Sequence, residues 1–166
     1  MLQKKVCMLG SFAVGKTSLV RRFVESIFDE KYHTTIGVKV DKKIVEVEGE
    51  KITLVLWDIH GEDVFQKLHM TYLRGMFGYL LVVDPTRRQT LDDALSLQER
   101  VQREMGSIPC IVILNKCDLA AEWEIDHDRI SALETSQTTT RTSAKTGEGV
   151  DEAFLSLAKA MLDAPS

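Results

Sequence analysis

Residues 10–17 constrain the fold more than any other part of the sequence. They follow an apolar run at 4–9, open a segment with helical periodicity at 16–26, and fit the pattern G-x-x-x-x-G-K-[ST]. In such a loop, glycine lets backbone N–H groups approach phosphate oxygens closely, and the helix N-terminus adds a partial positive charge. The sequence therefore predicts a strand–loop–helix unit that binds phosphate. The loop reads Gly10-Ser11-Phe12-Ala13-Val14-Gly15-Lys16-Thr17.

Two side chains of this loop suit a nucleotide bound with magnesium. Lys16 can place its ammonium group against the β- and γ-phosphates, and the Thr17 hydroxyl can ligate Mg²⁺. The loop does not distinguish ATP from GTP, because both present the same phosphates. The residues that we expect to contact the phosphates are Ala13, Val14, Gly15, Lys16, Thr17 and Ser18.

The rest of the chain predicts an α/β domain. Its 166 residues, 44% of them hydrophobic and 28% charged, suit a single domain spanning 1–166. Gly49-Glu50 separates two apolar runs by hairpin spacing, so these two strands should be antiparallel. The other strands are each followed by a helix, which predicts a mostly parallel sheet with one antiparallel edge strand. Further strands are expected at 38–48, 51–57, 79–84, 109–115 and, more weakly, 137–142, and further helices at 64–74, 91–105, 126–134 and 150–163.

Two short motifs at successive predicted strand ends can read a purine base. The first is Asn115-Lys116-Cys117-Asp118, and the second is Ser143-Ala144-Lys145. An ionised Asp118 would accept hydrogen bonds from the N1–H and the amino group of guanine. Adenine has an acceptor at N1 and lacks that amino group, so the buried carboxylate would be left unpaired.

The neighbouring residues can complete this base site. Lys116 can lay its aliphatic stem along the ring, and Asn115 can tie the loops together by hydrogen bonds. The Ala144 N–H is available to guanine O6, flanked by Ser143 and Lys145. The two motifs together favour guanine over adenine.

Taken together, these motifs resemble the small GTPases of the Ras superfamily, most of all the Rab branch. The resemblance runs from Lys4 to about Leu162 and also includes the segments 32–38 and 57–62. It implies a P-loop NTPase fold of the Ras-like G-domain type, a six-stranded sheet with five helices, and binding of GTP and GDP with Mg²⁺. It also implies exchange factors, GTPase-activating proteins and effectors as partners.

Several site residues lie in the two segments that would respond to the nucleotide, switch I (27–37) and switch II (58–72). Asp58 can hold Mg²⁺ through water, opposite the Thr17 hydroxyl. The resemblance implies that Thr35 completes the Mg²⁺ shell and contacts the γ-phosphate. Gly61 can offer its N–H to the same phosphate, and Phe28 is implied to pack near the guanine.

Two residues depart from the family in ways that affect catalysis. Glu62 stands where the family usually has a glutamine that orients the attacking water, and a carboxylate there repels the γ-phosphate. Phe12 would crowd the same space. We therefore expect slow hydrolysis, with Glu62, Lys16 and Thr35 as the catalytic candidates. A raised pKa would instead let Glu62 act as a general base or as a protonated donor.

Other side chains near the phosphates leave alternatives open. His60 could reach the phosphate or the attacking water, or could be a solvated switch residue. An internal arginine finger is an alternative to ordinary surface charge for three arginines, Arg74, Arg87 and Arg88.

Three functions are compatible with these residues. The leading hypothesis is a molecular switch that hydrolyses GTP slowly, and the second is a GTP-bound interaction module that hardly hydrolyses it. The third, an ATPase or small-molecule kinase, shares the phosphate loop but is disfavoured by Asp118.

Charge and cysteine content bear on partners and location. The net charge of −4 argues against nucleic acid as a partner. Three cysteines do not suggest a disulfide framework, and Cys7 and Cys110 lie in apolar runs, which predicts buried, reduced thiols and a cytoplasmic location. We expect no direct membrane anchor in this chain, so membrane association would need a lipidated tail or a partner outside it.

Overall fold

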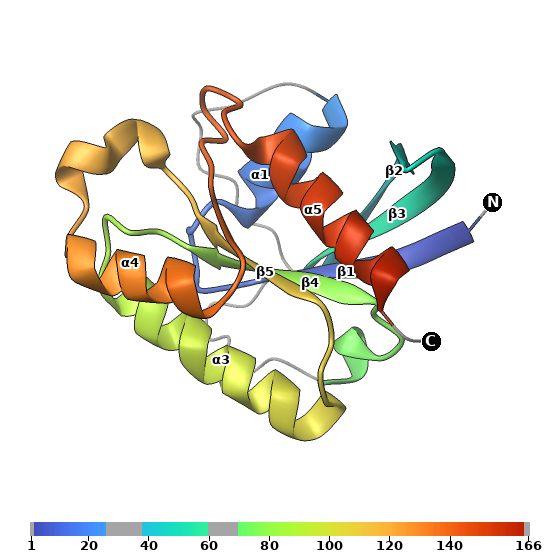
Figure 1. The fold of residues 1–166 in the computed structure, drawn as a ribbon, viewed down its shortest axis with the longest axis horizontal. Helices are drawn as coiled ribbons and strands as arrows, with labels where there is room; N and C mark the ends of the chain where they lie inside the picture. The colour runs from blue at the N-terminus through green and yellow to red at the C-terminus, as the bar shows by residue number, and fades with distance from the viewer. Residues whose placement is uncertain (1, 26–37, 60–69, 165–166) are drawn as a thin grey trace.

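A six-stranded sheet with helices on both faces forms the fold (Figure 1). The structure is a computed structural model that describes residues 2–25, 38–59 and 70–164. The strands are β1 (Leu2–Leu9), β2 (Val38–Val47), β3 (Glu50–Ile59), β4 (Gly78–Val83), β5 (Cys110–Leu114) and β6 (Thr139–Arg141). The helices of these residues are α1 (Lys16–Glu25), α3 (Gln89–Met105), α4 (His127–Ser136) and α5 (Val150–Asp163), with the 3₁₀ turns η1 (Met70–Leu73) and η2 (Cys117–Glu122).

The strand order is β2-β3-β1-β4-β5-β6, and only the β2–β3 pair is antiparallel. This confirms the predicted sheet, with β2 as the antiparallel edge strand. The predicted turn, Gly49-Glu50, is wrong by one residue, because Glu50 already pairs with Val47. The turn residues are Glu48 and Gly49, with φ of 52° and 79°, as a tight hairpin with positive φ at both central positions requires.

Successive side chains of the central strands point to opposite faces of the sheet, so the core is divided into two layers. On one face, Met8, Leu80 and Ile113 pack with the side chains of α1 and α5, where the rings of Phe23 and Phe154 stack with centroids 4.0 Å apart. On the other face, side chains such as Tyr79, Leu81 and Val112 pack against α3 and α4. All six residues of β4 are buried, as expected for a central strand covered on both faces.

Three sequence expectations need adjustment. Of the helix predicted at 64–74, residues 64–69 lie outside the described residues, and Met70–Leu73 forms a 3₁₀ turn. The weak strand predicted at 137–142 is shorter, Thr139–Arg141. Cys7 is buried as predicted, but Cys110 is only half-buried, because it is the first residue of β5.

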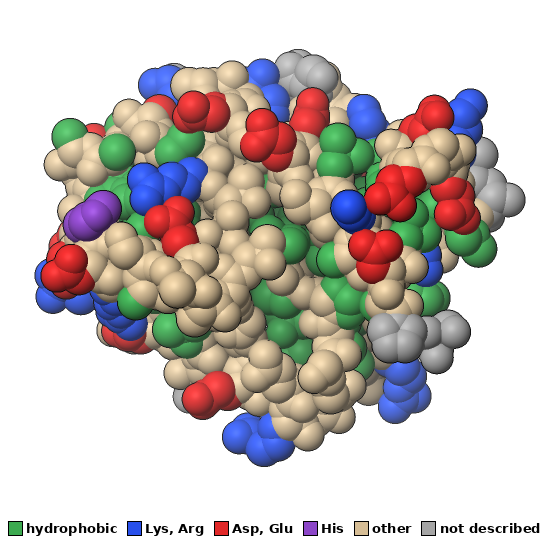
Figure 2. Space-filling view, in the orientation of Figure 1, with side chains coloured by type: hydrophobic (Ala, Val, Ile, Leu, Met, Phe, Trp, Pro, Cys, Tyr) green, Lys and Arg blue, Asp and Glu red, His purple; other side chains and the backbone are tan. Residues whose placement is uncertain are grey.

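Acidic and basic side chains are interspersed over the face seen in Figure 2, which agrees with the small net charge of −4. Within the described part of the chain, no helix combines the length and the apolar character needed to span a membrane.

The parallel strands all end at one edge of the sheet, and this edge positions the site. The loops that follow β1, β4, β5 and β6 begin at residues 10, 84, 115 and 142. Ligands of open α/β sheets bind beyond such an edge.

Replacing Gly149 tests how tightly the loop before α5 packs against the end of β6. A Cβ at this position would lie 2.1 Å from the Arg141 carbonyl oxygen, and φ is 71°. Gly75 is a matched control, because its φ is 79° and a Cβ there meets nothing within 4 Å. Both alanine variants should lose about 1 kcal/mol of unfolding free energy through the backbone conformation, and Gly149→Ala about 2 kcal/mol more through the clash. Urea unfolding measures both, and equal losses would contradict the packing described.

Candidate functional site

The phosphate loop leaves β1 and enters α1 with three residues at positive φ: Gly10 (147°), Ala13 (60°) and Gly15 (107°). Both glycines are required by close contacts as well as by conformation. A Cβ on Gly10 would lie 2.5 Å from the Val82 carbonyl oxygen, and one on Gly15 would lie 2.3 Å from Asn115 Nδ2. The glycines of the sequence pattern thus allow the loop to pass close to β4 and β5.

Lys16 lies under this loop and is only 3% exposed. Its ammonium group donates to the carbonyl oxygens of Gly10 at 2.7 Å and Ser11 at 3.2 Å. Burial lowers the pKa of Lys16 to about 8, although the nearby carboxylate of Asp58 opposes the change. An anion held in the loop would favour the charged form of this lysine.

Thr17 and Asp58 place two side-chain oxygen groups that could ligate a metal ion beside Lys16. The Thr17 hydroxyl donates to Asp58 Oδ2 at 2.5 Å, and Asp58 is 1% exposed. Its other oxygen, Oδ1, is buried and has no hydrogen-bond partner among the residues that the structure describes. A hydroxyl and a carboxylate with an unsatisfied oxygen fit Mg²⁺, which takes a few protein oxygens and completes its shell with water and phosphate.

Asn115 joins the phosphate loop to both base-reading loops. Its Nδ2 donates to the Val14 carbonyl oxygen at 3.0 Å, and its Oδ1 accepts from the Thr142 hydroxyl at 3.0 Å. Asn115 and Thr142 are both buried. Asn115 thus contacts both the phosphate loop and the end of β6, while its role in nucleotide binding stays a prediction.

Asp118 and Ser143 connect the two base-reading motifs directly. The Ser143 hydroxyl donates to Asp118 Oδ1 at 2.8 Å and accepts from the Thr146 N–H at 3.1 Å. The Ser143 carbonyl accepts from the Gly147 N–H at 2.7 Å. Because C=O and N–H of a trans peptide point in opposite directions, the Ala144 N–H points away from Gly147.

Two residues of this site are missing from the sequence prediction. Arg22, on α1, donates from Nε to the Ala144 carbonyl at 2.8 Å and from Nη2 to the Lys145 carbonyl. Asp84, directly after β4, accepts from Lys116 Nζ at 2.7 Å. An acidic residue after a fully buried strand was the one available signal for Asp84, whereas no local signal distinguishes Arg22 from a surface arginine.

Comparison with known proteins agrees with this geometry. A family profile described as "Ras family" matches residues 5–163. The chain belongs to the Ras family. The curated relatives that match it include Rab proteins along nearly the whole chain. It is 34% identical to "Ras-related protein Rab-13" of Canis lupus familiaris over 95% of this chain and 79% of that protein. It is 37% identical to "Ras-related protein Rab-4B" of Rattus norvegicus over 96% and 76%. For "GTP-binding protein ypt2" of Schizosaccharomyces pombe, the figures are 33%, 93% and 79%.

All three arginines considered as internal arginine fingers lie among the described residues of this Ras-family chain, and Arg74 is exposed. Arg87 binds Asp84 and the Phe12 carbonyl, and Arg88 binds Glu124. The candidates that lie outside the described residues, and so stay predictions, are Phe28, Thr35, His60, Gly61 and Glu62.

Removing the Thr142 hydroxyl tests the Asn115 tie. Thr142→Val keeps the shape of the side chain but leaves the buried Asn115 Oδ1 without its donor. We expect the unfolding free energy to fall by about 1–2 kcal/mol. Thr140→Val is the matched control, because Thr140 lies in β6 and is half-buried, and it should change stability by less than about 0.5 kcal/mol. Equal effects in urea unfolding would show that the tie contributes nothing.

Proposed function

We propose that this protein is a guanine-nucleotide switch that binds GTP and GDP with Mg²⁺ and hydrolyses GTP slowly. The observation that carries the proposal is the Asn115 contact set. It ties the phosphate loop at Val14 to Thr142, which directly precedes the second base-reading motif. Polyphosphate and base contacts are thus offered at one edge of the sheet. The similarity to "GTP-binding protein ypt2" supports the same ligand.

Base selection is assigned to Asp118 and Ala144. The Ser143 hydroxyl occupies one oxygen of the Asp118 carboxylate and so fixes its orientation. The carboxylate would accept from the two donors along the guanine edge, while the Ala144 N–H would donate to O6. Lys116 would cover the ring with its stem, since its ammonium group is held at Asp84.

Phosphate binding is assigned to the loop, and metal binding to the oxygen atoms of Thr17 and Asp58 beside it. Lys16 would transfer its hydrogen bonds from the loop carbonyls to phosphate oxygens, so its buried charge would gain an anionic partner. Thr17 and Asp58 would hold Mg²⁺, with Thr35 as the third protein group. Bound Mg²⁺ neutralises charge on the phosphates. Phe28 would pack at the base, and Gly61 would donate its N–H to the γ-phosphate.

The two switch segments, 27–37 and 58–72, would differ between the GTP and GDP forms and so provide the surface for exchange factors, activating proteins and effectors. Loss of the γ-phosphate removes the partner of Thr35 and Gly61, and this loss drives the change.

A second function, the hydrolysis-deficient interaction module, is favoured by Glu62 and by Phe12. A carboxylate at position 62 adds negative charge beside the γ-phosphate and lacks the amide donor. Phe12, one of the more exposed large apolar side chains, lies in the phosphate loop itself.

The variant Glu62→Gln separates the slow switch from the inert module. We expect it to raise the single-turnover rate of GTP hydrolysis at least about tenfold, because it removes the repulsion and restores an amide that can orient water. Glu50→Gln, at the exposed start of β3, is the control for loss of one negative charge and should leave the rate unchanged. If Glu62→Gln slowed hydrolysis, Glu62 would be a general base. If neither the wild type nor this variant converted bound GTP, the inert module would replace the switch.

Competition against labelled GDP tests the choice of base. In the presence of Mg²⁺, unlabelled GTP should displace the label, whereas ATP should fail to do so even in about a thousandfold excess, because it leaves Asp118 unpaired. Displacement by ATP and GTP at similar concentrations would favour the ATPase or kinase hypothesis and would rule out the guanine site.

A further inference from the structure

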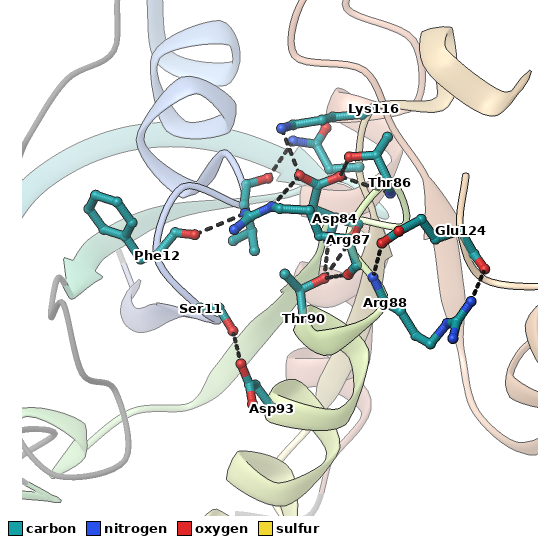
Figure 3. Close-up of polar contacts among 12 residues, drawn as sticks. Ser11, Phe12, Asp84, Thr86, Arg87, Arg88, Thr90, Asp93, Lys116 and Glu124 are labelled. Carbon is teal, nitrogen blue, oxygen red and sulfur yellow. Dashed lines mark hydrogen bonds and ion pairs between the residues drawn. The ribbon is translucent and has the colours of Figure 1, made fainter. Parts of the chain in front are cut away.

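Asp84 is a fully buried carboxylate on which four hydrogen bonds converge (Figure 3). Its Oδ2 accepts from Lys116 Nζ at 2.7 Å and from Arg87 Nε at 3.1 Å. Its Oδ1 accepts from the Thr86 N–H at 3.0 Å and from the Thr86 hydroxyl at 2.6 Å. Burial alone would raise the pKa of Asp84, but the bonds from Lys116, Thr86 and Arg87 outweigh it and lower this pKa. The carboxylate is therefore ionised and holds two cations.

Arg87 uses a second nitrogen to reach the phosphate loop. While Nε is bound to Asp84, Nη2 donates to the Phe12 carbonyl oxygen at 2.9 Å (Figure 3). The rigid guanidinium fork thus spans the end of β4 and the middle of the loop. No peptide bond of the described chain is cis, so with the Phe12 C=O turned toward Arg87, the Ala13 N–H of the same peptide points the other way.

This peptide leads into Ala13, the only non-glycine residue with positive φ in residues 10–17. Ala13 has a φ of 60°, which an alanine adopts only at some energetic cost, and it lies between two motif glycines. A backbone N–H binds phosphate well only when its direction is set before the ligand arrives. The Arg87 contact supplies that constraint from outside the loop.

The neighbouring Arg88 provides an internal comparison. It is exposed, like Arg87, but its Nη2 contacts the Glu124 carbonyl at 3.4 Å and its N–H donates to Glu124 Oε1 at 2.9 Å. In the contacts the structure describes, Arg88 is bound to the loop after β5 and not to the phosphate loop (Figure 3).

We propose that Arg87 is a positioning residue that sets the direction of the Ala13 N–H toward the nucleotide phosphates, and that Asp84 couples it to the base-covering Lys116. This inference rests on the proposed guanine-nucleotide function. One carboxylate then orients both a phosphate-binding element and a base-binding element. Loss of the Asp84 contact with Arg87, or of its contact with Lys116, weakens retention of the whole nucleotide.

Dissociation of a fluorescent GDP analogue from the Mg²⁺-loaded protein tests the proposal. The analogue should dissociate from Arg87→Gln about fivefold faster than from the wild type, because this variant loses a charge-assisted hydrogen bond made by a partly exposed group. The analogue should dissociate from Arg87→Lys as fast as from Arg87→Gln, because an ammonium group cannot replace the guanidinium group that bonds Asp84 and the Phe12 carbonyl at once. Arg88→Gln is the matched control and should stay within about twofold of the wild type.

Three results would overturn the proposal. One is a nucleotide dissociation rate of Arg87→Gln that equals that of Arg88→Gln. Another is a wild-type rate in Arg87→Lys, which would show that the contact needs only a positive charge. A purely structural role would lower the unfolding free energy of Arg87→Gln below that of Arg88→Gln without changing dissociation. This pattern would also overturn the positioning role.

A double-variant cycle tests the coupling through Asp84. Asp84→Asn should speed dissociation more than Arg87→Gln, because it releases Lys116 as well as Arg87. Adding Arg87→Gln to Asp84→Asn should then have little further effect. Effects that multiply independently would contradict the coupling. If the wild type itself bound no guanine nucleotide, the proposed function would fail. If the wild type bound the nucleotide but substitution of Arg87 left dissociation unchanged, only this inference would be overturned.

Discussion

The close approach of the Asn115 side chain to the backbone of the phosphate loop is the contact on which the site depends. It is possible only because residue 15 is glycine, since a Cβ there would lie 2.3 Å from Asn115 Nδ2. The same side chain also accepts from Thr142, so a single amide fixes three loops that come from different strand ends. Parallel pairing of the strands brings these ends to one edge, and the Asn115 contacts then set their spacing.

Around this contact, several groups of the candidate site are held by hydrogen bonds from other elements of the fold. Arg22 holds the carbonyls of Ala144 and Lys145 from α1, Ser143 holds Asp118, and Asp84 holds Lys116. The groups that would contact the base are thus held by hydrogen bonds from neighbouring side chains of the site. In the proposed site, such contacts would lower the entropic cost of ordering the base-binding groups when the nucleotide binds.

The sequence predicted those parts of the structure that depend on local pattern. Short apolar runs separated by helical periodicity predicted the strands and the mostly parallel sheet, and the glycine-rich loop was placed correctly between β1 and α1. The order of the strands across the sheet was not predicted. The hairpin turn was displaced by one residue, because Glu48 adopts a positive φ that its residue type does not signal. Asp84 and Arg22 were missed because their roles arise from contacts with residues far away in the chain, at 116 and at 144–145. Such contacts form only when the sheet is assembled.

The central claim is that the protein retains a guanine nucleotide at this edge of the sheet. The most direct measurement is chromatographic identification of the nucleotide released when protein purified in the presence of Mg²⁺ is denatured. The account predicts GDP or GTP in close to one-to-one ratio with protein, and its loss when the metal is removed with a chelator. Retention of adenine nucleotides, or of no nucleotide although Mg²⁺ is present, would contradict the account.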